Sequence, residues 1–116
     1  RQIETLAKVQ NENGLWHTLL MDNSSYVETS ATAGFAFGIL KAIRKRYIDR
    51  KYEDTALKAV NAVINNINED GEVQNVSFGT AMGNDLQFYK DIPITPMPYG
   101  QSLSVLCLVE YLNYFK

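Results

Sequence analysis

Four stretches of the chain have the apolar spacing of helices, and two kinds of pattern alternate among them. In residues 51–68 apolar side chains recur every three or four positions and polar side chains fill the rest, which predicts a helix with one face toward water. Residues 24–47 and 98–115 are apolar nearly all round, as is typical of helices buried on most sides. Residues 1–10 form a shorter amphipathic stretch. Along the chain, amphipathic helices with one face toward water, here called outer, alternate with mostly buried helices, here called inner. This order predicts an all-α protein.

The helix predicted over residues 24–47 has a recognisable start and a stripe of small side chains. Ser25 and Glu28 have the spacing of a capping box, in which each residue satisfies a free backbone donor of the other. Gly34 and Gly38 lie on one face, and each costs a helix about 1 kcal/mol relative to alanine. We therefore predict that another backbone approaches this face closely. The whole stripe consists of Ser30, Gly34, Gly38 and Ala42.

A polar turn ending in glycine recurs after two of the predicted helices. Its copies are residues 11–14 and residues 68–71, and each leads into an extended run, expected at residues 15–21 and 73–78, before the next apolar helix. Both long connections, the second including residues 79–97, run from an outer to an inner helix. Long loops gathered on one rim of a rigid scaffold commonly carry function. The pattern predicts a ring of α-hairpins, an (α/α) toroid, of which this chain supplies one edge.

Composition and charge exclude several functions. The chain is 46% hydrophobic and carries a net charge of −2, and its basic residues gather mostly at one helix end, which argues against a nucleic-acid or anionic-membrane partner. No stretch reaches the roughly 20 apolar residues that span a bilayer. The lone Cys107 cannot form an internal disulfide, which is compatible with a reducing, cytoplasmic compartment. Arg1 opens what reads as the tail of a helix already under way, so we expect a C-terminal piece of a longer protein.

Three stretches, taken in order, resemble the signature of glycoside hydrolase families 88 and 105, the unsaturated glucuronyl and rhamnogalacturonyl hydrolases. The first joins Gly14-Leu15-Trp16 and Asp22 to the run Glu28-Thr29-Ser30-Ala31-Thr32, which opens an apolar helix. The second is the loop Ser77-Phe78-Gly79-Thr80-Ala81-Met82-Gly83. The third, Pro96-Met97-Pro98-Tyr99-Gly100-Gln101, leads into the last helix, where Pro98 suits the first turn.

The resemblance implies an (α/α)6 barrel with its active site at the N-terminal ends of the inner helices, and residues 1–116 as a single partial domain from the C-terminal part. It implies that an Asp protonates the double bond of a 4,5-unsaturated uronic acid, that water adds to the neighbouring carbon, and that the sugar is then released. No cofactor or metal is implied, and the partner is an unsaturated oligosaccharide. The family's catalytic Asp lies upstream of this region. We therefore expect the chain alone to be inactive and to bind the remainder of the barrel or to self-associate.

Six residues on the expected functional rim are candidate substrate contacts: Trp16, His17, Thr95, Met97, Tyr99 and Gln101. Trp16 either stacks on a sugar ring or packs beneath the loop. His17 either contacts substrate or is a structural histidine, and no other histidine or nearby cysteine completes a metal site. Glu28 is either a helix-capping residue or a carboxylate that takes part in catalysis. The last four residues open the final helix, whose free N–H groups are suited to a uronate carboxylate.

Two other functions are compatible with these patterns. One is a helical binding module for a carbohydrate or a protein, which would bind without turnover. The other is a different (α/α) toroid enzyme such as a sugar epimerase, which would isomerise its substrate and leave the double bond intact.

Overall fold

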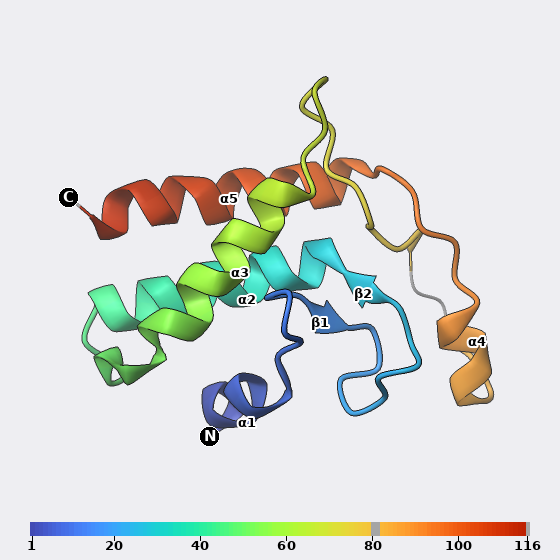
Figure 1. Ribbon diagram of the computed structural model, residues 1–116, viewed down its shortest axis with the longest axis horizontal. Coiled ribbons are helices and arrows are strands. Elements are labelled where there is room, and N and C mark those ends of the chain that lie inside the picture. Colours follow the sequence, from blue (N-terminus) through green and yellow to red (C-terminus); the bar gives the residue numbers. More distant parts are fainter. Residues whose placement is uncertain (80–81, 116) are drawn as a thin grey trace.

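The helix α2 (Thr29–Arg44) occupies the middle of the computed structural model, which describes residues 1–79 and 82–115 (Figure 1). It packs against both α3 (Glu53–Asn65) and α5 (Pro98–Tyr114), which contact each other much less. The remaining elements are α1 (Gln2–Val9), β1 (Trp16–His17), β2 (Val27–Glu28), the 3-10 helix η1 (Arg50–Tyr52) and α4 (Leu86–Lys90). The predicted class, helical hairpins with short strands in the long connections, is confirmed. Thr80 and Ala81 of the predicted loop motif lie outside the described residues.

The apolar faces of α2 and α3 form the core, as their spacing predicted. The buried members on these helices are Ala33, Ala36, Ile39, Leu40, Ile43, Ala56, Ala59, Val60 and Val63. Asp49 caps the helical turn that precedes α3, because its side chain accepts a hydrogen bond of 2.7 Å from the N–H of Lys51. In Figure 1, α2 and α5 run in the same direction, and α3 runs back the opposite way to the start of the second long connection. The N-terminal ends of the two inner helices therefore lie at one end of the molecule.

The start of α2 differs from the prediction. The helix begins at Thr29, and Glu28 is itself the N-cap, accepting hydrogen bonds from the N–H groups of Ser30 (3.1 Å) and Ala31 (2.9 Å). Ser25 lies in the preceding turn. The predicted capping box was therefore wrong, because Glu28 pairs as the last residue of a strand and its carboxylate folds forward onto the first turn.

The extended runs are shorter than predicted. β1 and β2 pair antiparallel, with Trp16 opposite Glu28 and His17 opposite Val27. The run predicted at residues 73–78 makes isolated bridges in place of a strand, from Val73 to Ile67 and from Ser77 to Ile94. Each of these pairings lies within one connection and folds that connection back on itself.

The two glycine-ended turns have the same backbone hydrogen bonds. The N–H of Gly14 donates to Asn11 O at 2.9 Å, and the N–H of Gly71 donates to Asn68 O at 3.0 Å. Both glycines have positive φ, 91° and 83°. Left-handed backbone of this kind favours glycine, so the recurrent sequence reflects a recurrent turn.

Each turn is tied to the helix that follows it in the same way. Two residues after the first glycine, the N–H of Trp16 donates to Thr32 Oγ1 in α2 at 3.1 Å. Two residues after the second, the N–H of Val73 donates to Gln101 Oε1 in α5 at 3.0 Å. The sequence repeat therefore marks two equivalent joints between a connection and an inner helix.

The close approach predicted at the glycines of α2 is found elsewhere. A Cβ added to Gly34 or Gly38 would meet no atom within 4 Å among the described residues, so the predicted approach to this stripe is wrong for the described chain. A Cβ on Gly100 in α5 would lie 2.7 Å from Cγ2 of Val76. Glycine is thus needed where α5 packs against the preceding connection.

One face of α5 is buried and the other is open. The buried face consists of Gly100, Ser104, Cys107 and Glu110. The open face exposes Val105, Leu106, Val109 and Leu112, each at about half its area or more. The prediction that α5 is buried on most sides is wrong within this chain, because its fully buried side chains are small or polar, and Leu103, Leu108, Tyr111 and Tyr114 are only partly buried against the core. Among the helices of residues 1–79 and 82–115, none combines the length and the hydropathy of a membrane-spanning segment.

Candidate functional site

A cavity of about 580 Å³ lies at the shared end of the two inner helices. Its walls come from the start of α2, the first turns of α5 and both long connections. The lining residues are His17, Thr18, Leu20, Glu28, Ser30, Ala31, Phe35, Ser77, Gly79, Tyr99 and Leu103. This is the rim on which the sequence predicted the functional loops to gather.

Glu28 joins two walls of the cavity. Besides capping α2, its buried carboxylate accepts from the hydroxyl of Ser30, 2.6 Å from Oε1, and its Oε2 lies 3.4 Å from the N–H of Ser77 in the second connection. A carboxylate at a helix N-terminus is stabilised by the positive end of the helix dipole. Its oxygens are therefore engaged by donors of this chain, and the capping interpretation of Glu28 accounts for its position.

His17 is held through both ring nitrogens. Nδ1 lies 2.6 Å from Ser25 O, and because a carbonyl only accepts, Nδ1 carries the proton. Nε2 lies 2.9 Å from the side-chain nitrogen of Asn11, whose oxygen accepts from the N–H of Asn13 and so fixes the amide orientation. His17 thus lines the cavity while both of its ring nitrogens are engaged by groups of this chain.

Trp16 is in the core. Its side chain has no exposed surface, and Nε1 donates to Leu6 O at 2.9 Å. Its ring packs edge-on against Phe35, with centroids 5.2 Å apart. Of the two aromatic rings, Phe35 is the one that reaches the cavity. Sequence reasoning missed Phe35, although it lies one helical turn after Ala31 on the cavity side of α2.

Tyr99 forms part of the α5 wall. Its hydroxyl accepts a 3.0 Å hydrogen bond from the N–H of Gly79, which holds the second connection at the edge of the cavity. The side chain is 36% exposed. Among the described residues, the hydroxyl proton has no acceptor, so it is available to a ligand.

The other candidates on the last helix lie away from this cavity. Gln101 ties α5 to the second connection, because its side chain accepts a hydrogen bond from the N–H of Val73 and donates one to the carbonyl of Gly71. Gln101 and Met97, the N-cap of α5, border a separate cavity of about 330 Å³. Thr95 pairs through its N–H with Val76 O at 2.7 Å. The structure thus brings His17 and Tyr99 together and places the other four candidates elsewhere.

Comparison with known proteins extends these observations. The family model described as Glycosyl Hydrolase Family 88 matches residues 1–115. The unsaturated rhamnogalacturonyl hydrolase YesR of Bacillus subtilis is 35% identical over 97% of this chain and 31% of its own length. The chain therefore spans about a third of that relative.

Solved structures agree with this assignment. A possible family 105 member from Salmonella enterica serovar Paratyphi A is 57% identical, with a TM-score of 0.97 over 99% of this chain and 30% of its own. A family 105 glycoside hydrolase from C. acetobutylicum shares the fold, with 23% identity and a TM-score of 0.85 over 96% of this chain and 35% of its own. The predicted fold class, an α-hairpin segment of an (α/α)6 toroid, is confirmed. The chain belongs to the family 88/105 group of glycosyl hydrolases.

Proposed function

We propose that the cavity at the starts of α2 and α5 is part of the substrate cleft of a hydrolase that removes 4,5-unsaturated uronic acid from oligosaccharides. The observation that carries the proposal is this cavity's position, lined by Tyr99 from one inner helix and by Phe35 from the other. A concave site with an apolar wall and a few fixed polar groups is typical of ligand binding. The activity named for YesR supports the substrate class.

The proposed reaction is the hydration of a vinyl ether. A carboxylic acid outside these residues protonates C4 of the C4=C5 double bond, and water adds at C5 and returns a proton to that carboxylate. The resulting hemiketal opens by breaking the bond between C5 and the ring oxygen, which leaves a ketone at C5 and a hemiacetal at C1. Breakdown of the hemiacetal to an aldehyde releases the rest of the oligosaccharide as an alcohol. The residues of this chain bind and orient the uronate. Tyr99 donates its hydroxyl proton to the sugar or its carboxylate, and Phe35 supplies an apolar surface for a ring face. His17 and Glu28 position the walls that these two residues line.

The test is an absorbance assay on the full-length protein. A lyase-generated unsaturated disaccharide should lose the ultraviolet absorbance of its double bond, whereas its saturated counterpart should be unchanged. Tyr99→Phe should lower kcat/KM, and Tyr47→Phe, at an 80% exposed position remote from the cavity, should not. Unchanged absorbance with both glucuronyl and galacturonyl substrates would reject the function. Isomerised product with the double bond intact would favour an epimerase.

Under the same proposal, this chain is the C-terminal part of the barrel. The isolated 116 residues are then inactive, because the proton donor implied by the family resemblance lies upstream of them. Mixing the isolated chain with the same disaccharide should leave its absorbance constant. A cytoplasmic location stays a prediction.

A further inference from the structure

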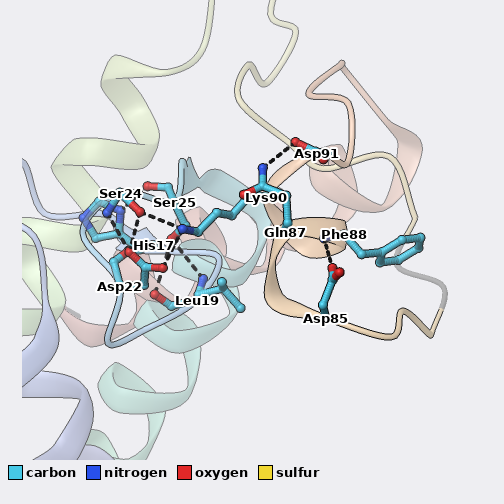
Figure 2. A network of polar contacts seen from close by, with 10 residues as sticks. All are labelled: His17, Leu19, Asp22, Ser24, Ser25, Asp85, Gln87, Phe88, Lys90 and Asp91. Atoms are coloured by element: carbon cyan, nitrogen blue, oxygen red, sulfur yellow. Dashed lines mark hydrogen bonds and ion pairs between the residues drawn. The ribbon is translucent and has the colours of Figure 1, made fainter.

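An ion pair joins the two long connections, both of which contribute residues to the cavity wall. Lys90 Nζ, at the end of α4, lies 2.8 Å from Asp22 Oδ2 in the first connection and donates to Ser24 Oγ at 2.8 Å (Figure 2). The two side chains are 25% and 32% exposed, so the pair is at the surface but partly shielded. We refer to Asp22, Ser24 and Lys90 as the rim clasp.

Asp22 is held in place to receive the lysine. Its Oδ1 accepts from the N–H of Ser24 at 2.9 Å and from the hydroxyl of Ser24 at 2.6 Å. Hydrogen bonds from Lys90 and Ser24 keep the pKa of the Asp22 carboxyl well below its usual range. The acceptor of the rim clasp is therefore charged throughout the physiological pH range.

The segment that carries Lys90 has few other ties to the body. No residue of α4 is buried, and Leu86 and Phe88 are 63% and 38% exposed. This segment leaves and rejoins the rest of the second connection at a paired base, because the N–H of Phe78 donates to Pro93 O at 2.8 Å. We refer to the part of the chain between Phe78 and Pro93 as the excursion. The other polar contacts of α4 drawn in Figure 2 are local: Asp85 caps the helix and Gln87 binds Asp91.

Both partners of the rim clasp belong to connections that line the cavity. Thr18 and Leu20 line it shortly before Asp22, and Gly79 lines it at the start of the excursion. We propose that the rim clasp holds residues 82–92 at the mouth of the cavity and thereby sets the access of substrate to it. This inference rests on the proposed function for its substrate.

A partly exposed ion pair suits this role because it is weak. Such pairs contribute little net stability, and salt screens them. The rim clasp can therefore open without disturbing the core, while the base of the excursion at Phe78 and Pro93 stays paired.

The first test is hydrogen exchange in the full-length protein without substrate. Asp22→Asn and Lys90→Met should speed amide exchange in residues 86–91, and Lys90→Arg, which keeps the charge, should restore slower exchange. Asp91→Asn is the matched control, because it removes a neighbouring carboxylate that binds Gln87 and leaves the clasp intact. Exchange in 86–91 that is equal in all variants would overturn the rim clasp.

The second test is steady-state kinetics with the unsaturated disaccharide. Lys90→Met should raise KM by up to about five-fold with little change in kcat, because loss of this one exposed pair frees residues 82–92 from the position in which they receive the substrate. In about 0.5 M salt the wild-type KM should rise toward that of the variant, because screening weakens the pair. Faster exchange with an unchanged KM would overturn the role in access. A full-length protein that consumes no such substrate would instead reject the proposed function, and the exchange result alone would then decide whether the clasp exists.

Discussion

The guanidinium of Arg44 binds the carboxylate of Glu110 through two hydrogen bonds, Nε to Oε1 at 2.7 Å and Nη2 to Oε2 at 3.2 Å. Glu110 is the single charge on α5 and is 4% exposed, whereas Arg44 ends α2 and is 34% exposed. The paired geometry joins the C-terminal ends of the two inner helices. The pair therefore links the two inner helices at the end opposite the cavity.

Loss of this pair should destabilise the protein. Arg44→Met leaves the buried carboxylate of Glu110 without a partner, so the free energy of unfolding should fall by about 1–3 kcal/mol. Arg44→Lys keeps the charge but not the two-pronged geometry and should lose less. Thermal unfolding of the full-length variants measures both effects. Equal melting temperatures for wild type and Arg44→Met would contradict the structural role of the pair.

The two turn glycines should respond differently to alanine. Both have positive φ, which costs a residue with a side chain about 1–2 kcal/mol. At Gly14 the added Cβ would also collide with the backbone oxygen of Lys58, whereas at Gly71 it would meet nothing within 4 Å. Gly14→Ala should therefore reduce stability clearly more than Gly71→Ala in denaturant unfolding. The reverse order would show that the first turn does not pack on α3 as described.

The buried thiol of Cys107 should be unreactive. Its side chain has no exposed surface, and burial raises the pKa of the thiol to about 11. Because the thiolate is the reactive form, it is scarce below that pH, and a thiol reagent at pH 8 should label Cys107 only after unfolding. Mass spectrometry of native and denatured samples checks this. Rapid labelling of the native protein would contradict the packing of α5 on α2.

The isolated chain should self-associate through the open face of α5. The four large apolar side chains exposed there form a contiguous patch, and large apolar patches are unusual on the surface of a monomer. A double substitution, Leu106→Glu with Leu112→Glu, adds charge at positions that are 48% and 69% exposed and should shift the population toward monomer. Light scattering measures the masses. A monodisperse wild-type monomer would contradict the prediction.

The helices were predictable because their evidence is local. The spacing of Ala56, Val60 and Val63 predicted the buried face of α3 correctly. Pro98 marked the start of α5. The repeated turn was also visible, because positive φ restricts the residues that can end it.

The details of the site depend on contacts between residues distant in sequence. Whether Glu28 is the cap or the third residue of α2 depends on its strand pairing with Trp16, which local spacing does not report. The sequence contained Asp22 and Lys90 but no signal that they meet, and α4 is too short for a periodic pattern. The faces of α5 were ambiguous because apolar side chains surround it, so packing against α2 decided which were buried.

The most direct test fills the cavity and measures turnover. Ala31 lines the cavity from the first turn of α2 and is exposed, so Ala31→Trp places an indole in it without disturbing the core. Asn61→Trp, on the exposed face of α3, is the control. In the full-length protein, we predict that Ala31→Trp abolishes the loss of ultraviolet absorbance from an unsaturated disaccharide while the melting temperature and the control's activity stay at wild-type values. Wild-type turnover by Ala31→Trp would contradict the assignment of this cavity to the substrate cleft.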